Sequence, residues 1–402
     1  MRTVWCLFIL FAPLAAQTID VTPSRALVDE TAAIRVSGCQ PGERIALQAE
    51  LIDGGGRHWV SQSEFIADAQ GGIDISKQAP IGGSYKEVSA MGPVWSMKPM
   101  GSKEGRYQPP PKFGPQSIEF HLVRKGAVVS IAHLEQIPVS DGIARLTVHE
   151  GRLRGILFSP PDGAAHPAIL VLGGSEGGLP TRRAAWFASH GYAALALAYF
   201  RFDDLPRELL GIPLEYFGEA LAWMSHRREI IADRIAVSGT SRGGELALQL
   251  GSMYTNIKAV VAYVPADVRY PACCDIRPQQ PAWTWKGYGL AFDRISNQGP
   301  ISEAGAEITV EQTHAPILLI SGGEDGVWNS SSMTDSLVSR LRRARFAYEV
   351  VRLNYPHAGH SAGRPEIIPE EQGSVRNPTS GREMEMGGTP KGNAESSLDA
   401  PA

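Results

Sequence analysis

A serine framed by two glycines stands where an apolar run gives way to a helical one. Gly239-Thr-Ser241-Arg-Gly243 has the form G-x-S-x-G and follows the apolar residues 234–238, "RIAVS". In a sharp turn from strand to helix, this pattern exposes the serine hydroxyl at the apex. The chemistry it indicates is nucleophilic attack on an acyl carbonyl. The chain has 43 glycines, so a G-x-S-x-G match can arise by chance. The motif therefore indicates a nucleophile only if a base and an acid are found elsewhere in the chain.

The general base is sought among the histidines after Ser241, because this turn usually has its partners in the chain order Ser, acid, His. Three histidines follow Ser241, namely His314, His357 and His360. His314 precedes the candidate acid, so the order excludes it. His360 follows an Ala-Gly pair, whose small side chains let a loop bend toward the nucleophile. We therefore predict His360 as the base and His357 as a loop or wall residue.

The carboxylate that orients this base is expected just after a late strand. The apolar run 316–321, "PILLIS", leads into Gly322, and Glu324 and Asp325 follow. We predict Asp325 as the acid, with Glu324 as the alternative. A metal bound by the two late histidines has little support, because no third ligand has suitable spacing. We expect neither a metal nor a cofactor.

Two N–H donors are needed to stabilise a tetrahedral intermediate. One is the backbone N–H of Arg242, next to the nucleophile. The second is expected from the loop 173–178, "GGSEGG", at Ser175 or Glu176. This loop lacks the G-K-[ST] ending and the G-x-G-x-x-G spacing of nucleotide-binding loops, so nucleotide binding is not expected.

The elements that must position these residues alternate between residues 147 and 369. Continuous apolar runs such as "AILVLGG", "YAALALAY" and "IKAVVAYVP" alternate with helical patterns such as "LEYFGEALAWMSHR". Strands that are apolar throughout are typical of a parallel sheet covered on both faces. The pattern predicts an α/β hydrolase fold with a mostly parallel sheet, whose ligands lie at the carboxyl ends of the strands. The aromatic stretch 279–294, "QQPAWTWKGYGLAFDR", is expected to form an apolar wall or lid, or simply to pack.

Residues 17–146 have a different pattern. Short alternating runs such as "RIALQAELID" are separated by turn sequences such as "CQPGE" and "DGGG", and no helical period is sustained. This predicts an immunoglobulin-like antiparallel β-sandwich.

The ends of the chain differ from both domains. Residues 1–16 combine Arg2, an apolar stretch and small residues, the order of a secretory signal peptide. We therefore expect an exported protein, periplasmic or secreted, with no stable membrane span once the signal is removed. Residues 370–402 are rich in Gly, Pro and Ser and are predicted to form a mobile polar tail. With 38 Lys and Arg against 42 Asp and Glu and no basic stripe, nucleic acid is not expected as a partner.

The chain resembles the acyl-CoA thioesterase and bile acid-CoA:amino acid N-acyltransferase family over nearly all of its mature length. The runs that carry the resemblance are "GSYKEVSAMGPVWSMKP", similar to the family's Met-Gly-x-x-Trp-Ser-Met signature, and "ALAYFRFDDLP", "GTSRGGELAL", "SGGEDGVWNS" and "YPHAGH". The resemblance implies acyl transfer from a thioester through an acyl-serine, with Ser241 as nucleophile, His360 as base and Asp325 as the residue that orients the base. Relatives that conjugate acyl groups to amino acids are known for cysteine at the nucleophile position, so the serine favours hydrolysis.

Several functions stay open from the sequence. The first hypothesis is hydrolysis of a small-molecule acyl thioester or ester. Because coenzyme A is scarce outside the cytoplasm, an exported protein could act on another carboxylic ester, or transfer the acyl group to an amine or alcohol. A protein of a different class is also considered, a ligand-binding surface protein with a vestigial hydrolase domain.

Overall fold

The chain folds into two compact units. The computed structural model describes residues 16–101, 105–274, 278–296, 299–369 and 374–400. The first unit takes residues 1–26, 31–103 and 116–136, and the second takes 27–30, 104–115 and 137–402. The second unit thus begins earlier than the predicted boundary at residue 147 and also includes two short segments from within the predicted sandwich. The predicted signal peptide falls, apart from Ala16, outside the described residues.

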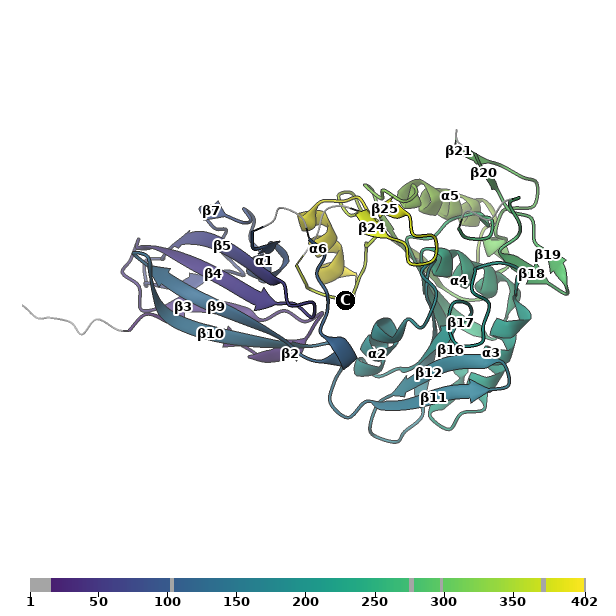
Figure 1. The fold of residues 1–402 in the computed structure, drawn as a ribbon, viewed down its shortest axis with the longest axis horizontal. Helices are drawn as coiled ribbons and strands as arrows, with labels where there is room; N and C mark the ends of the chain where they lie inside the picture. Colours follow the sequence, from purple (N-terminus) through teal and green to yellow (C-terminus); the bar gives the residue numbers. More distant parts are fainter. Residues whose placement is uncertain (1–15, 102–104, 275–277, 297–298, 370–373, 401–402) are drawn as a thin grey trace, which may run out of the picture. The chain divides into compact units, whose positions relative to one another are not determined.

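The first unit is an antiparallel β-sandwich, as predicted (Figure 1). One sheet has the strand order β1-β3-β6, and the other has β2-β10-β9-β4-β5-β7 with β8 paired to β5. In β4, Ile45, Leu47, Ala49 and Leu51 are buried while the residues between them are more exposed. This alternation, which the sequence shows, places every second side chain in the core.

The elements of this part of the chain have the following bounds: β1 Thr18–Thr22, β2 Arg25–Leu27, β3 Ala33–Ser37, β4 Arg44–Ile52, β5 His58–Ile66, β6 Ile73–Asp74, β7 Gly82–Gly83, α1 Gly92–Trp95, β8 Lys98–Pro99, β9 Gln116–Arg124 and β10 Ala127–Ile137.

The second unit is built on an eight-stranded sheet of order β11-β12-β14-β13-β16-β17-β22-β23. The first two pairings are antiparallel, and the five from β14 to β23 are parallel. The prediction of a mostly parallel α/β hydrolase sheet is therefore confirmed. The bounds of these strands are β11 Ala144–Glu150, β12 Leu153–Ser159, β13 His166–Leu172, β14 Ala193–Ala198, β16 Ile230–Thr240, β17 Ile257–Tyr263, β22 Ile317–Gly322 and β23 Val350–Tyr355.

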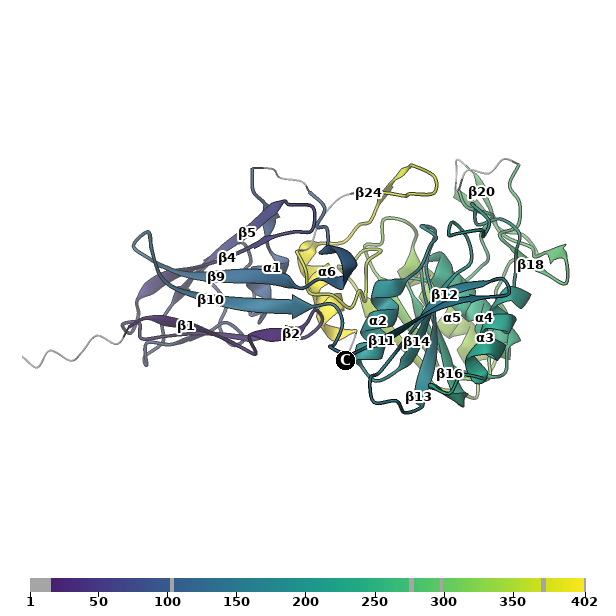
Figure 2. The ribbon, with the colours of Figure 1, turned by 60° about the horizontal axis from the view of Figure 1, so that its bottom comes forward.

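Helices cover both faces of this sheet (Figure 2). On β13, Leu170 faces the core shared with α3 and α4, while Val171 faces the core shared with α2. The helices are α2 Thr181–Ser189, α3 Glu215–Ser225, α4 Arg242–Met253, α5 Ser330–Arg343 and α6 Pro390–Asp399. In the described part of the chain, none of the helices has both the length and the apolar character needed to cross a bilayer.

Shorter elements connect the large ones. They are η1 Pro111–Phe113, β15 Ile212–Pro213, β18 Trp283–Trp285, β19 Tyr288–Gly289, β20 Arg294–Ser296, β21 Gly299–Ile301, η2 Val310–Gln312, β24 Ser374–Arg376 and β25 Glu383–Glu385.

The C-terminal segment is ordered where the sequence predicts a mobile tail. It contains the hairpin β24–β25 and the helix α6 (Figure 1). The side chain of Thr389 caps α6 by accepting a hydrogen bond from the backbone N–H of Gly392. The buried residues of α6 are small, among them Gly392, Ala394 and Ser396, so the helix shows no apolar period from which it could be predicted.

Candidate active site

Ser241 sits at the turn between β16 and α4 in a strained backbone conformation, with φ 58° and ψ −120°. Such a conformation is unfavourable for a residue with a side chain and persists only where its surroundings enforce it. The flanking glycines explain how the turn fits, because a Cβ at Gly239 would overlap the carbonyl of Gly243, and a Cβ at Gly243 would overlap the carbonyl of Gly173. The motif in the sequence therefore forms the strand-turn-helix that it predicts.

The structure brings Ser241, His360 and Asp325 together. His360 Nε2 lies 2.9 Å from Ser241 Oγ, and His360 Nδ1 lies 2.9 Å from both carboxylate oxygens of Asp325. The side chain of Asp325 is fully buried and that of His360 is 6% exposed. These are the distances at which an imidazole can take a proton from a hydroxyl while a carboxylate fixes its orientation.

The loop after β22 fixes the orientation of Asp325. Its Oδ1 accepts hydrogen bonds from the backbone N–H groups of Val327, at 3.0 Å, and Trp328, at 3.2 Å. The Trp328 indole donates from Nε1 to the carbonyl of Val264 and meets the His360 ring edge to face, with 5.4 Å between ring centres. The acid and the base are thus held by the same loop.

The two alternatives of the sequence, Glu324 and His357, bind each other instead. His357 Nδ1 lies 2.8 Å from Glu324 Oε1, and both side chains are exposed. This pair lies on the surface while its neighbours Asp325 and His360 point inward. The sequence leaves both Asp325 and Glu324 as candidate acids, and the structure places Asp325 against His360 and Glu324 on the surface.

The glycine-rich loop 173–178 lies next to Ser241. A Cβ at Gly174 would stand 3.4 Å from Ser241 Cβ, and the N–H of Gly174 donates to Glu176 Oε1 at 2.9 Å. Among the described residues, no protein acceptor is found for the N–H groups of Ser175 and Glu176. Either group is therefore available to donate to a ligand.

Two buried groups support this part of the site. The Tyr199 hydroxyl donates to the carbonyl of Gly173 at 2.6 Å, and burial raises the pKa of Tyr199 well above its ordinary value, so the hydroxyl stays a donor. The side chain of Arg242 is buried beside Glu245, with 3.4 Å between Nη1 and Oε2. Burial raises the pKa of Glu245, and the Arg242 guanidinium opposes that rise.

The hairpin β24–β25 holds the glycine-rich loop 173–178 through hydrogen bonds to Ser175. The sequence analysis did not predict this role. Asn377 Nδ2 donates to Ser175 Oγ at 2.8 Å, and Thr379 Oγ1 donates to the Ser175 carbonyl at 2.9 Å. Asn377 is almost fully buried. No periodicity marks residues 374–385, and the signal available was the Asn-Pro-Thr-Ser-Gly turn itself.

The segment after the hairpin supports the histidine loop. The N–H of His360 donates to the carbonyl of Met386 at 2.7 Å, and the N–H of Gly359 donates to Asn393 Oδ1 at 2.8 Å. Asp325 pairs with Gly387 in an isolated antiparallel bridge. Residues 374–400 therefore contact His360, Asp325 and the glycine-rich loop, which makes the predicted mobile tail a supporting part of the candidate site.

The aromatic stretch divides between packing and exposure. Trp283 is buried, packs beside Tyr199 and Phe217, and donates from Nε1 to Glu245 Oε1 at 2.6 Å. Tyr288, by contrast, is 79% exposed. Simple packing accounts for Trp283.

A polar hollow of about 440 Å³ opens beside the glycine-rich loop. Arg201, Arg207, Glu208 and Thr379 are among the residues that line it. Arg201 also donates to the carbonyl of Glu176 at 3.0 Å, which ties the hollow to the loop. Its volume lies in the range of small-molecule sites.

Comparison with known proteins finds family models that match parts of both units. The model for the "Acyl-CoA thioester hydrolase/BAAT N-terminal region" matches residues 29–150, and the model for "BAAT / Acyl-CoA thioester hydrolase C terminal" matches residues 212–401. Acyl-coenzyme A thioesterase 6 of Homo sapiens is 30% identical over 403 residues, covering 96% of this chain and 94% of the relative. Acyl-coenzyme A thioesterase 1 of Mus musculus is 30% identical over 399 residues, covering 95% and 94%. Among solved structures, a putative dienelactone hydrolase from Klebsiella pneumoniae covers 54% of this chain and 86% of its own, with 15% identity and a TM-score of 0.38.

Proposed function

The chain belongs to the acyl-CoA thioester hydrolase/BAAT family, and from that premise we propose that it hydrolyses acyl thioesters through an acyl-serine on Ser241. The relatives are acyl-CoA thioesterases and the fold is that of a hydrolase. The single observation that carries the serine mechanism is the 2.9 Å contact between Ser241 Oγ and His360 Nε2, with Asp325 on the other ring nitrogen.

The proposed reaction has two halves. Ser241 Oγ attacks the thioester carbonyl as His360 Nε2 takes the hydroxyl proton, and the C–S bond then breaks while His360 returns that proton to the leaving thiolate. In the second half, water attacks the acyl-serine and His360 accepts a proton from it. The serine then takes the proton back and the free acid leaves. Asp325 stabilises the imidazolium in both halves.

The oxyanion of each tetrahedral intermediate is assigned to two backbone donors. One is the N–H of Arg242 at the start of α4, and the other is the N–H of Ser175 or Glu176. Donors held in place before the reaction stabilise the developing charge without reorganisation, and losing one such donor costs on the order of 10²- to 10³-fold in kcat.

Export remains part of the proposal because of the order of residues 1–16, with Arg2 ahead of an apolar stretch and two alanines. If these residues direct export, the substrate is a thioester or carboxylic ester found outside the cytoplasm rather than a coenzyme A ester. N-terminal sequencing of the mature protein, expressed with the full leader, tests for cleavage after residue 16.

A fluorophosphonate probe tests the mechanism. We expect the probe to label Ser241, as mapped by peptide mass spectrometry, and Ser241→Ala to lose both labelling and turnover by about 10⁴-fold or more. The matched control is Ser225→Ala, a partly buried serine at the end of α3 whose loss should leave both unchanged. A panel of acyl-CoA and simple acyl esters then ranks the substrates. Turnover that survives in Ser241→Ala contradicts the acyl-serine, and absence of turnover on the whole panel favours a binding protein.

A further inference from the structure

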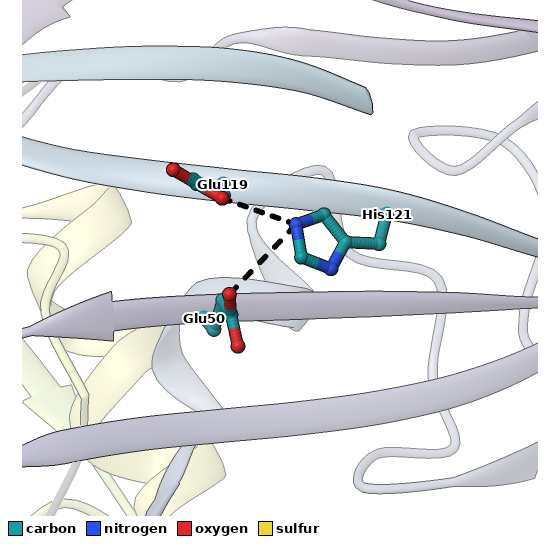
Figure 3. Close-up of side chains that lie close together, drawn as sticks. All are labelled: Glu50, Glu119 and His121. Atoms are coloured by element: carbon teal, nitrogen blue, oxygen red, sulfur yellow. Dashed lines mark hydrogen bonds and ion pairs between the residues drawn. The ribbon is translucent and has the colours of Figure 1, made fainter. Parts of the chain in front are cut away.

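The solvent face of the β-sandwich carries a cluster of carboxylates and imidazoles that the proposed reaction does not use. Glu50 lies on β4, and Glu119 and His121 lie on β9 (Figure 3). His121 Nε2 lies 3.1 Å from Glu119 Oε2 and 3.8 Å from Glu50 Oε1. One ligating atom from each of the three side chains lies within 4.8 Å of the others.

The register of the strands makes this cluster electrostatically unusual. Glu50 is paired directly with Glu119 across β4 and β9, and like charges in such positions destabilise a sheet. Among the described residues, every ion-pair partner of these two carboxylates is a histidine: His58 and His121 at Glu50, and His121 and His133 at Glu119. An imidazole is cationic only when it is protonated. The pair of carboxylates therefore has no permanent positive charge beside it.

A divalent cation between the two carboxylates would remove that repulsion. Zinc bonds of about 2.0–2.1 Å in a tetrahedral site place neighbouring ligand atoms roughly 3.3 Å apart. His121 Nε2 lies 3.1 Å from Glu119 Oε2 and 3.8 Å from Glu50 Oε1, and these two distances bracket that value before any ion is bound. Mixed imidazole and carboxylate donors suit zinc, whereas Ca²⁺ and Mg²⁺ prefer oxygen ligands alone.

We propose that Glu50, Glu119 and His121 form a zinc site on the β-sandwich, separate from the acyl-transfer chemistry. His58 Nε2 lies 3.0 Å from Glu50 Oε2, the carboxylate oxygen on the other side from His121, and so holds the Glu50 side chain in place. The His121 side chain is only 16% exposed, so the site is partly shielded from water. Because the ligands come from β4 and β9, a bound ion would link two neighbouring strands and stabilise the folded sandwich.

No spacing in the sequence indicates this site. Glu119 and His121 are two residues apart on one strand, and Glu50 comes from a strand 69 residues earlier by numbering (119 − 50). Alternation in β4 and β9 directs all three side chains to the same face, and the antiparallel register brings them together.

Zinc binding to the full-length chain tests the proposal. After dialysis against a chelator, calorimetric titration with Zn²⁺ should show one equivalent bound with a dissociation constant on the order of 10⁻⁶ M or tighter. Ca²⁺ should bind much more weakly. His121→Ala and the double variant Glu50→Gln/Glu119→Gln should each weaken zinc binding by at least about tenfold. The zinc-induced rise in Tm should be lost with it.

The matched control is His149→Ala in the other unit. His149 Nδ1 lies 3.8 Å from Asp203 on the surface, an imidazole and carboxylate pair outside the cluster. This variant should bind zinc as the unchanged chain does. Equal weakening in the control, or unaltered binding in His121→Ala, overturns the proposal.

Anomalous scattering at the zinc edge, from crystals of the unchanged chain, gives an answer that does not depend on how the variants fold. A peak between Glu50 and His121 supports the site. A peak elsewhere, or none at zinc concentrations that saturate the calorimetric signal, contradicts it.

Discussion

In the α/β unit the candidate acid Asp325 and the candidate base His360 have buried side chains, whereas in the β-sandwich Glu50 and Glu119 stand on the solvent face of regular strands. Asp325 is fully buried, while Glu50 and Glu119 are 32% and 43% exposed. A buried carboxylate needs fixed partners because water cannot solvate it, and Asp325 has them in His360 and two backbone N–H groups. Carboxylates on an open face keep their water and can exchange partners. Burial therefore fixes the geometry of one cluster and leaves the other free to take up an ion.

The comparison is tested most strongly at the buried carboxylate. Asp325→Asn should lower kcat by roughly 10³- to 10⁴-fold, because the amide leaves the imidazolium without its negative partner. Glu324→Gln is the matched control, since the Glu324 side chain is paired with the exposed His357, and its activity should stay within about twofold. Steady-state kinetics on the preferred acyl substrate compare the two. Equal losses in both variants would show that burial does not distinguish the carboxylates.

The stability of the β-sandwich should depend on its buried apolar face rather than on its exposed polar side chains. Phe120 on β9 is fully buried and lies between the exposed-face residues Glu119 and His121 in the chain. Phe120→Ala should destabilise the first unit by about 3–5 kcal/mol, through lost burial and the cavity left behind. Urea unfolding of the full chain, with hydrogen exchange followed over residues 116–124, measures the effect. Ser117→Ala on the exposed face should change stability by about 0.5 kcal/mol or less. A loss of stability as large as that of Phe120→Ala would contradict the alternation of buried and exposed side chains along β9.

The C-terminal hairpin tests how far the support of the site extends. Asn377→Ala removes the hydrogen bond to Ser175 Oγ and should lower kcat by about tenfold, because the loop that carries the proposed oxyanion donor is held less firmly. KM should change less than kcat. Ser374→Ala, which removes a surface contact with Glu383 in the same hairpin, is the control and should be silent. An Asn377→Ala variant with unchanged kcat would mean that the loop is positioned without the hairpin.

The smallest effect is expected at the ion pair of His190 with Asp29 in the α/β unit, where the histidine side chain is 35% exposed and the carboxylate 5%. The Asp29 carboxylate, 2.9 Å from His190 Nε2, raises the pKa of this histidine, and partial burial opposes the rise. Because the folded pKa lies above the unfolded value of about 6.5, the stabilisation is complete below that pH and is lost as pH rises through the folded pKa. Water screens the pair, so about 1 kcal/mol or less is involved. Unfolding midpoints at pH 5.5 and 8.5 should differ more for the unchanged chain than for Asp29→Asn, and identical differences would contradict the assignment.

Much of the α/β unit could be predicted from the sequence. The apolar strands and the helices α2, α3, α4 and α5 follow from periodicity, and the G-x-S-x-G turn marks Ser241. The chain order of the triad leads to His360. Helix α6 could not be predicted in this way, because its buried residues are small and polar and give no apolar period.

By itself, the sequence determined the two fold classes and the turn that presents Ser241 as the candidate nucleophile, since local propensity, periodicity and glycine placement are written in consecutive residues. Only the tertiary structure placed the Asp325 side chain against His360 and the side chain of its neighbour Glu324 on the surface. It also placed Asn377 against Ser175 and Glu50 against His121, contacts between residues far apart in the chain. Such contacts depend on strand register and on how loops pack at the ends of a sheet, and those are set by the folded chain as a whole.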